Sequence, residues 1–291
     1  MKKAFIQLHI AVFLAGFTAI LGKLIELNEG MLVLYRMLIT FITLAIIMFW
    51  RRELRTLPVK ETLIICGVGV IVALHWVTFY GSIKYSNVSV SLTCLSAIGF
   101  FTSFLDPLIN RRRIDIVEVF LGLLCIAGIY LIFDFYPEYK VGIIFGIISA
   151  LLASLFPILN ANLLKKHSGK TVTLYEMGGG ALALVFILPL YLKQFPAAYY
   201  LPTLNDWLWL LVLAWLCTVL SFLLSLNALK KIPPFTCNLT YNLEPVYGIL
   251  MAFAIFHENK YLSAGFYYGL GLILFSVILQ MVRVVKGRQI K

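Results

Sequence analysis

The sequence predicts an all-α membrane protein of ten transmembrane helices, arranged as two inverted five-helix repeats with both termini in the cytoplasm. The 291 residues are 62% hydrophobic and only 13% charged, whereas a soluble domain carries about 25% charged residues. Apolar stretches of roughly 18 residues, each long enough to cross the hydrocarbon core, recur along the chain. The hydrophobic pattern also runs through twice, with five membrane-length segments in each copy.

The two copies share short segments that lie 140 to 147 positions apart. The matches are Leu34-Tyr35-Arg36-Met37 with Leu174-Tyr175-Glu176-Met177, Ile83-Lys84 with Leu229-Lys230, and Gly122 with Gly269. Because five crossings are an odd number, the second copy must enter the bilayer from the opposite side. We therefore divide the chain into repeats 1–140 and 141–291. Inverted repeats of this kind are typical of secondary transporters.

Helices are favoured over barrel strands because the apolar runs are continuous and do not alternate every second residue. Turn signals such as Asn28-Glu29-Gly30, Ser168-Gly169 and Pro233-Pro234 separate the runs. The predicted spans, in chain order, are 4–25, 30–50, 61–83, 87–109, 116–133, 141–163, 171–192, 206–229, 235–256 and 261–283. The run after Lys2-Lys3 is about 20 residues long without a small-residue cleavage site, so we interpret it as the first span.

The loop charges predict the orientation of these spans. Of the 24 Lys and Arg residues, 18 fall on the side of the N-terminus and 5 on the other side, and Arg36 lies within a span. Cytoplasmic loops carry an excess of Lys and Arg, so both termini are predicted to be cytoplasmic. This distribution also explains the net charge of +11 by contact with anionic lipids. No aromatic-basic module or zinc motif indicates nucleic-acid binding.

The ninth span holds the densest group of polar residues. Asn238, Tyr241, Asn242 and Pro245 share one helical face, with Glu244 beside it near the middle of the span. Pro245 cannot donate to a backbone carbonyl one turn earlier, which leaves an acceptor free at mid-depth. We interpret this cluster as the core of a substrate site, in which Glu244 binds a proton or a substrate amine. The alternative is that these groups only pair neighbouring helices.

The third and fourth spans add candidates from the first repeat. Trp76 and Tyr80 share a face, so they line a cavity or form an aromatic belt, and His75 precedes them as a core residue or a proton relay. Thr93 and Ser96 are expected to face the cavity of the ninth span, although close helix packing is the competing explanation.

Arg36 and Glu176 occupy matching repeat positions with opposite charge. Each lies about two turns from opposite membrane surfaces, so their difference in depth excludes a direct ion pair. No protease, hydrolase, nucleotide-binding or dinucleotide-binding motif is present, and the five cysteines lack metal-ligand spacing. We therefore predict no enzyme activity, no metal and no cofactor.

These features together resemble an EamA-type member of the drug/metabolite transporter superfamily. The resemblance covers both halves and rests on Leu34-Tyr35-Arg36, on the segment after Ser86-Asn87, and on the run from Leu243-Glu244-Pro245 to Glu258. In the first half, Gly99 and Arg112 stand where the family often has Pro and Glu. The resemblance implies a central cavity lined by spans 1, 3, 4, 6, 8 and 9, with spans 5 and 10 peripheral. It also implies movement of small metabolites, often export of amino acids.

We therefore predict a secondary transporter that exports small organic metabolites such as amino acids by alternating access in a bacterial cytoplasmic membrane, with protonation of Glu244 as the means of coupling to protons. Its partners would be a small-molecule substrate and the lipid bilayer. A passive facilitator with a structural Glu244 is one alternative. A membrane protein that scaffolds partners or performs lipid chemistry is the other, and the lack of loop domains argues against it.

Overall fold

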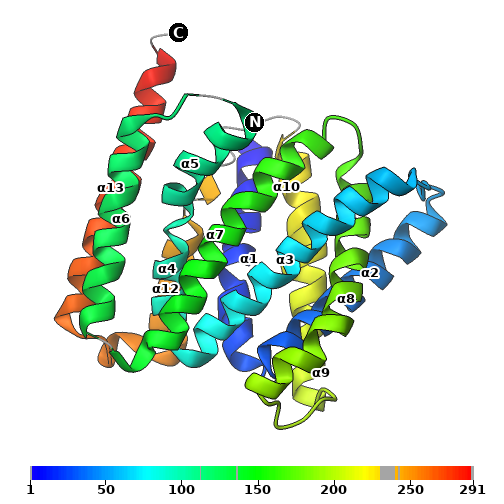
Figure 1. The fold of residues 1–291 in the computed structure, drawn as a ribbon, viewed down its shortest axis with the longest axis horizontal. Coiled ribbons are helices and arrows are strands. Elements are labelled where there is room, and N and C mark those ends of the chain that lie inside the picture. The colour runs from blue at the N-terminus through cyan, green and yellow to red at the C-terminus, as the bar shows by residue number, and fades with distance from the viewer. Residues whose placement is uncertain (1, 112, 136, 230–239, 242, 290–291) are drawn as a thin grey trace.

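The computed structural model describes residues 2–111, 113–135, 137–229, 240–241 and 243–289. These residues form helices and connecting turns, and no strand occurs among them (Figure 1). Seven helices or helix pairs within them are long and apolar enough to cross a membrane, and shorter apolar helices accompany them. Large apolar side chains such as Phe49, Trp50, Leu108, Ile116 and Phe186 lie exposed on the outside, as lipid contact requires.

The first half consists of helices joined by short, capped connections. The Asn28 side chain accepts from the backbone of Gly30 at the start of the second helix, and Asn87 accepts from Val90 at the start of the fourth. The helices are α1 (Lys2–Leu24), α2 (Glu29–Trp50), α3 (Val59–Tyr85), α4 (Val88–Leu95), α5 (Ile98–Asn110) and α6 (Ile116–Phe135).

The second half follows the same plan. Ser168 caps its second helix, and Thr203 and Asp206 form a reciprocal capping box at the start of its third. The elements are η1 (Pro137–Tyr139), α7 (Lys140–Leu163), α8 (Gly169–Gln194), α9 (Leu204–Ala214), η2 (Trp215–Leu220), α10 (Ser221–Leu229), α12 (Glu244–Phe256), η3 (Glu258–Lys260) and α13 (Ala264–Gln289). The η2 segment is a π-helix between α9 and α10.

Besides the ninth span, which has a turn at Leu243, two predicted spans are interrupted in the structure. The predicted continuous helix 87–109 is broken at Ser96 and Ala97, where backbone N–H groups bond three residues back, to Thr93 and Cys94. The predicted span 206–229 contains the π-helix, which adds one residue to a turn. Neither interruption contains glycine or proline, so the sequence carried no breaker signal at these positions.

The two halves match each other closely around the break in the fourth span. Helices α5 and α12 each have 13 residues, and each ends before a residue with left-handed backbone, Arg111 at φ 53° and His257 at φ 54°. A turn at Leu243 precedes α12, as the turn at Ser96 and Ala97 precedes α5. Matching helices also contact each other in pairs: α2 with α8, α4 with α12, and α6 with α13.

The α6–α13 pair, side by side at one edge of the bundle (Figure 1), repeats its contacts across the two halves. A Cβ atom on Gly128 would lie 2.6 Å from the Gly269 carbonyl oxygen, and one on Gly269 would lie 2.5 Å from the Gly128 oxygen. Each glycine also faces an isoleucine of the other helix, Ile273 or Ile132. Both helices therefore need glycine here to approach so closely. Helix α1 begins and α13 ends at the same end of the bundle.

Candidate functional site

Arg36 is the centre of a buried polar cluster that joins the two halves. It lies seven residues into α2, about 10 Å along the helix, and its exposed fraction is 4%. Its Nη1 donates to the Tyr80 hydroxyl at 2.6 Å, while Nε and Nη2 both donate to the Thr218 hydroxyl, at 3.2 and 3.1 Å. The guanidinium is thus held by one residue of the first half and one of the second.

Two aromatic residues of α3 hold the guanidinium. The Trp76 ring lies 3.6 Å from the Arg36 guanidinium carbon, close enough for a cation–π interaction. Tyr80 is fully buried beneath it, and Gly22 of α1 makes room for the Tyr80 ring, because a Cβ there would lie 2.3 Å from the ring. The structure therefore brings the predicted residues Trp76 and Tyr80 together with Arg36.

Thr218 reaches Arg36 from the π-helix η2. Its hydroxyl donates to the Leu213 carbonyl at 3.0 Å, five residues back, and so presents its lone pairs to the guanidinium. Just after the π-helix, Ser221 donates to the Ala11 carbonyl of α1 at 3.1 Å. Single-turn π segments occur frequently at functional sites, and here the segment places the one described hydroxyl that binds two nitrogens of Arg36.

Glu244 stands in the first turn of α12, immediately after the Leu243 turn, and is half-buried. Gly16 of α1 packs against its backbone, since a Cβ on Gly16 would lie 2.8 Å from the Glu244 carbonyl oxygen. Arg36 is the cation that acts electrostatically on the Glu244 carboxyl. No ion pair joins the two within the described part of the chain, so Arg36 acts on this carboxyl across the junction of the repeats without contact.

The remaining predicted residues have local partners. Thr93 is fully buried and donates to the Ser89 carbonyl at 2.7 Å, and Ser96 donates to the Leu92 carbonyl at 3.4 Å. Tyr241 shares a 2.5 Å hydrogen bond with Ser225 of α10. Asn238 and Asn242 lie outside the described residues.

His75 links two helices. Its Nδ1 lies 2.9 Å from the Ser149 hydroxyl and 3.0 Å from the Ser149 carbonyl oxygen on α7, and that hydroxyl is also within reach of the His75 carbonyl. Its ring packs beside Phe79 and Phe156. These contacts are those of a buried connection between α3 and α7.

Sequence reasoning did not include two members of this cluster, Arg36 and Thr218, among the site residues. Arg36 carried a usable signal: it is the one Lys or Arg that the span assignment left within the membrane, and such residues mark functional sites by default. Thr218 carried none, because the π-helix that turns its hydroxyl toward Arg36 is not visible in the apolar pattern.

At the end of the bundle opposite the termini, an ion pair and several hydrogen bonds join neighbouring segments. Glu258 is 4% exposed; it forms an ion pair with Lys23 of α1 at 2.8 Å and accepts from the backbone and hydroxyl of Ser89 at 2.9 and 2.6 Å. Lys84 donates to the carbonyls of Ile25 and Leu27 beyond α1. The Glu258 contacts join the first and second halves at this end, whereas the Lys84 bonds hold α3 to the turn after α1 within the first half.

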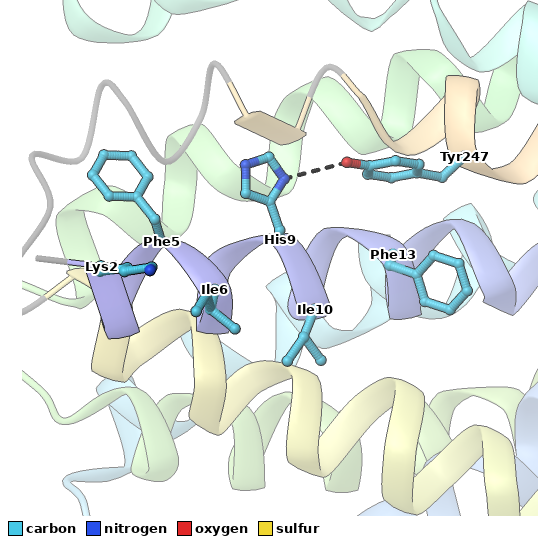
Figure 2. Close-up of a pocket in the computed structure, with 7 residues that line it drawn as sticks. All are labelled: Lys2, Phe5, Ile6, His9, Ile10, Phe13 and Tyr247. Atoms are coloured by element: carbon cyan, nitrogen blue, oxygen red, sulfur yellow. Dashed lines mark hydrogen bonds between the residues drawn. The ribbon is translucent and has the colours of Figure 1, made fainter.

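A groove of about 560 Å³ runs along α1 (Figure 2). Its lining is apolar apart from a few polar groups, and His9 bonds with the Tyr247 hydroxyl at 3.2 Å across it. The groove ends on α1 at Phe13, one turn before Gly16, the residue that packs against Glu244. The residues that line it are Lys2, Phe5, Ile6, His9, Ile10, Phe13 and Tyr247.

Comparison with known proteins identifies the family. The EamA-like transporter family matches the chain twice, over residues 2–134 and 140–282. An uncharacterized transporter of Archaeoglobus fulgidus is 26% identical over 197 residues, which is 68% of this chain and 69% of that protein. A solved crystal structure shares the fold, with a TM-score of 0.62, at 13% sequence identity over 95% of this chain and 96% of its own. The protein is thus a multi-pass membrane protein that belongs to the EamA-like transporter family.

Proposed function

We propose that the protein is a secondary transporter that exports small metabolites carrying both a carboxylate and an amino group, such as amino acids, by alternating access. The observation that supports this most is the buried Arg36 guanidinium, held at the junction of the two repeats, which acts electrostatically on the Glu244 carboxyl. In this scheme Arg36 binds the substrate carboxylate and Glu244 binds its ammonium group.

Arg36 has N–H groups that could donate to such a ligand. A guanidinium has five N–H donors, and the described residues accept from Nε and from one N–H each of Nη1 and Nη2. One N–H on each terminal nitrogen therefore has no acceptor among the described residues. These two N–H groups, one on each terminal nitrogen, would each donate to one oxygen of a carboxylate.

Further candidates surround this pair. Trp76 and Tyr80 would contact the apolar part of the substrate, because both lie against the guanidinium. Asn238, Tyr241 and Asn242 would provide polar contacts from the second half, and Thr93, Ser96 and His75 would support the wall from the first. The breaks before α5 and α12 support this placement, because interrupted helices at matching positions of two repeats are typical of transporter binding sites.

The membrane arrangement that we propose has ten spans and both termini in the cytoplasm of a bacterial cell, within its cytoplasmic membrane. The excess of Lys and Arg in loops on the side of the termini supports this orientation. Glu258, Lys23 and Lys84 would then close the outer end. Opening that end would require breaking the contacts of Glu258 with Lys23 and Ser89, which join the two halves; this is the outward-facing step of alternating access.

The test begins with metabolites measured inside and outside cells with and without the gene. Export predicts that at least one amino-group metabolite accumulates inside the cells that lack it. That metabolite is then assayed in proteoliposomes with wild type, Glu244→Gln, and Lys170→Met as a control from a surface ion pair. We expect flux to fall about 10-fold or more in Glu244→Gln, because a hydrogen bond to a charged group contributes about 1.5–3 kcal/mol, and to persist in Lys170→Met.

The same vesicles separate the transporter from its alternatives. Accumulation against a gradient that requires a proton-motive force supports proton coupling, whereas equilibration alone identifies a passive facilitator. Vesicles that pass none of the identified metabolites above background would contradict transport and favour a scaffold.

A further inference from the structure

Glu176 is a buried carboxyl that the proposed substrate site does not use. It lies seven residues into α8, which begins at Gly169, and its exposed fraction is 5%. At about 1.5 Å per residue, this places it about 10 Å along the helix from its start. A charged carboxylate at such a position is strongly unfavourable unless a partner neutralises it.

Helix α3 packs closely against the turn of α8 that contains Glu176. A Cβ atom on Gly69 would lie 2.1 Å from the Glu176 carbonyl oxygen, so the two backbones are in contact there. The Cys66 thiol also donates to the Tyr175 carbonyl at 3.5 Å. Helix α2 faces the same stretch of α8 with apolar side chains, Phe41 against Gly178 and Met37 against Gly180.

Helix α7 supplies the one polar partner. The Asn160 side chain hydrogen-bonds with the Glu176 carboxyl. A carboxylate can only accept, so the amide NH₂ is the donor in that bond. Two buried oxygens then remain without a hydrogen-bond partner among the described residues, Glu176 Oε1 and Asn160 Oδ1. Both are acceptors, so neither can satisfy the other while the carboxyl is ionised.

No described cation balances this carboxyl. Burial and the Asn160 hydrogen bond are the influences on it, and no charged side chain is among them. Of the ionisable groups on the packing helices, the Cys66 thiol of α3 contacts this turn. The other charged or titratable groups of α2, α3, α7 and their flanks are not among these influences: Glu29, Tyr35, Arg36, Arg51, Arg52, Glu53, Arg55, Lys60, Glu61, His75, Tyr80, Lys84, Tyr85, Tyr139, Lys140, Lys165, Lys166, His167 and Lys170.

We propose that Glu176 and Asn160 form a proton-binding site. A proton on Glu176 Oε1 makes that oxygen a donor, which bonds to Asn160 Oδ1 while the amide N–H bonds to the second carboxyl oxygen. One O–H bond forms on Glu176 as one O–H bond breaks in the hydronium ion that delivers the proton, which leaves water. This ligand satisfies both partnerless oxygens at once, as in a cyclic acid–amide pair. A metal ion fits less well, because no group of three or more metal-binding side chains occurs in the described part of the chain.

The site joins a side chain of α7 with a side chain of α8, so its occupancy depends on the separation of these two helices. Separating α7 from α8 would break the acid–amide pair and expose an acid that ionises in water. Proton release would thus accompany that motion. This coupling rests on the proposed transport function, whereas the proton site itself does not.

Infrared difference spectroscopy of the protein in nanodiscs tests the site directly. Wild type at neutral pH is expected to show the carbonyl stretch of a protonated carboxylic acid, shifted by exchange into D₂O. Glu176→Gln should remove one component of this band, and Glu53→Gln should not. Glu53 is a suitable control because its hydrogen bond from Lys170 holds its pKa below the usual range. A Glu176→Gln spectrum that superimposes on wild type would overturn the proposal.

Asn160→Leu provides a second variant that keeps the carboxyl. It should retain the band but move it to higher frequency, since the carboxyl loses its hydrogen-bond partner. An unchanged frequency would contradict the pair even if Glu176→Gln failed to fold. In vesicles with a pH-sensitive dye, Glu176→Gln should lose substrate-linked proton movement. If wild type transports nothing, the transport proposal fails while the infrared result still decides the proton site.

Discussion

Arg36 and Glu176 occupy matching positions in the two repeats, yet their surroundings differ in kind. Arg36 has a ring stacked on it and two hydroxyls that accept from three of its N–H groups. Glu176 is equally buried and has one amide partner. The two repeats thus share the position of a buried ionisable residue. The helices packed around that position determine which partners the residue has.

The sequence explains part of this difference. The third and eighth spans are related by 146 positions, as Lys84 and Lys230 show, so Trp76 and Tyr80 correspond to Phe222 and Leu226. At these two positions the second repeat therefore has neither the hydroxyl nor the indole that hold Arg36 in the first. A buried carboxylate that lacks such partners is stabilised when it binds a proton or a ligand. Glu176 is therefore suited to bind and release a proton, whereas Arg36 is suited to stay charged and bind a carboxylate.

The largest expected effect compares neutral replacements at the two positions. Arg36→Gln should lower the free energy of unfolding by about 2–4 kcal/mol, because it loses charge-assisted bonds to Tyr80 and Thr218 and the contact with Trp76. Glu176→Gln should change it by less than about 1 kcal/mol, because an amide resembles the protonated acid. Thermal unfolding in nanodiscs measures both. Equal decreases in the free energy of unfolding would contradict the difference in partners between the two positions.

A smaller effect is expected where the halves are alike. Gly128→Ala and Gly269→Ala each place a Cβ within 2.6 Å of a carbonyl oxygen on the partner helix, so each should cost about 1–3 kcal/mol. Gly271→Ala is the matched control on α13, because a Cβ there meets nothing within 4 Å. Similar losses for the first two, with little change in the control, would confirm that this pair is symmetric. A large difference between them would contradict it.

The smallest effect concerns the exposed ion pair between Glu53 and Lys170 near the start of α8. The hydrogen bond from Lys170 lowers the pKa of Glu53 below its usual value of 4.5. Its stabilisation is therefore present above that value and is lost as the pH falls through the lowered pKa. Wild type should unfold at slightly higher temperature than Glu53→Gln at pH 7, and the two should converge at the acidic end. A difference that grows on acidification would contradict this sign.

Much of the helical arrangement could be predicted, since apolar runs and loop signals locate helices almost residue by residue: the expected 30–50 and 141–163 are Glu29–Trp50 and Lys140–Leu163. The break at Ser96 and Ala97 and the π-helix at 215–220 could not, because both depend on tertiary packing of residues with ordinary helical propensity. The same limit applies to the site. Trp76 and Tyr80 were recognisable as aromatic residues on one face, and Arg36 as a charge within a span, but their contact with each other becomes apparent only when α2, α3 and η2 are brought together.

The most direct test of the central claim is the affinity of the nanodisc-embedded protein for the metabolite that cells without the gene retain. It is measured for wild type, Arg36→Met and Lys170→Met. If Arg36 binds the substrate carboxylate at the junction of the repeats, Arg36→Met binds at least about 10-fold more weakly and Lys170→Met binds like wild type. Wild-type affinity in a folded Arg36→Met protein would contradict the account.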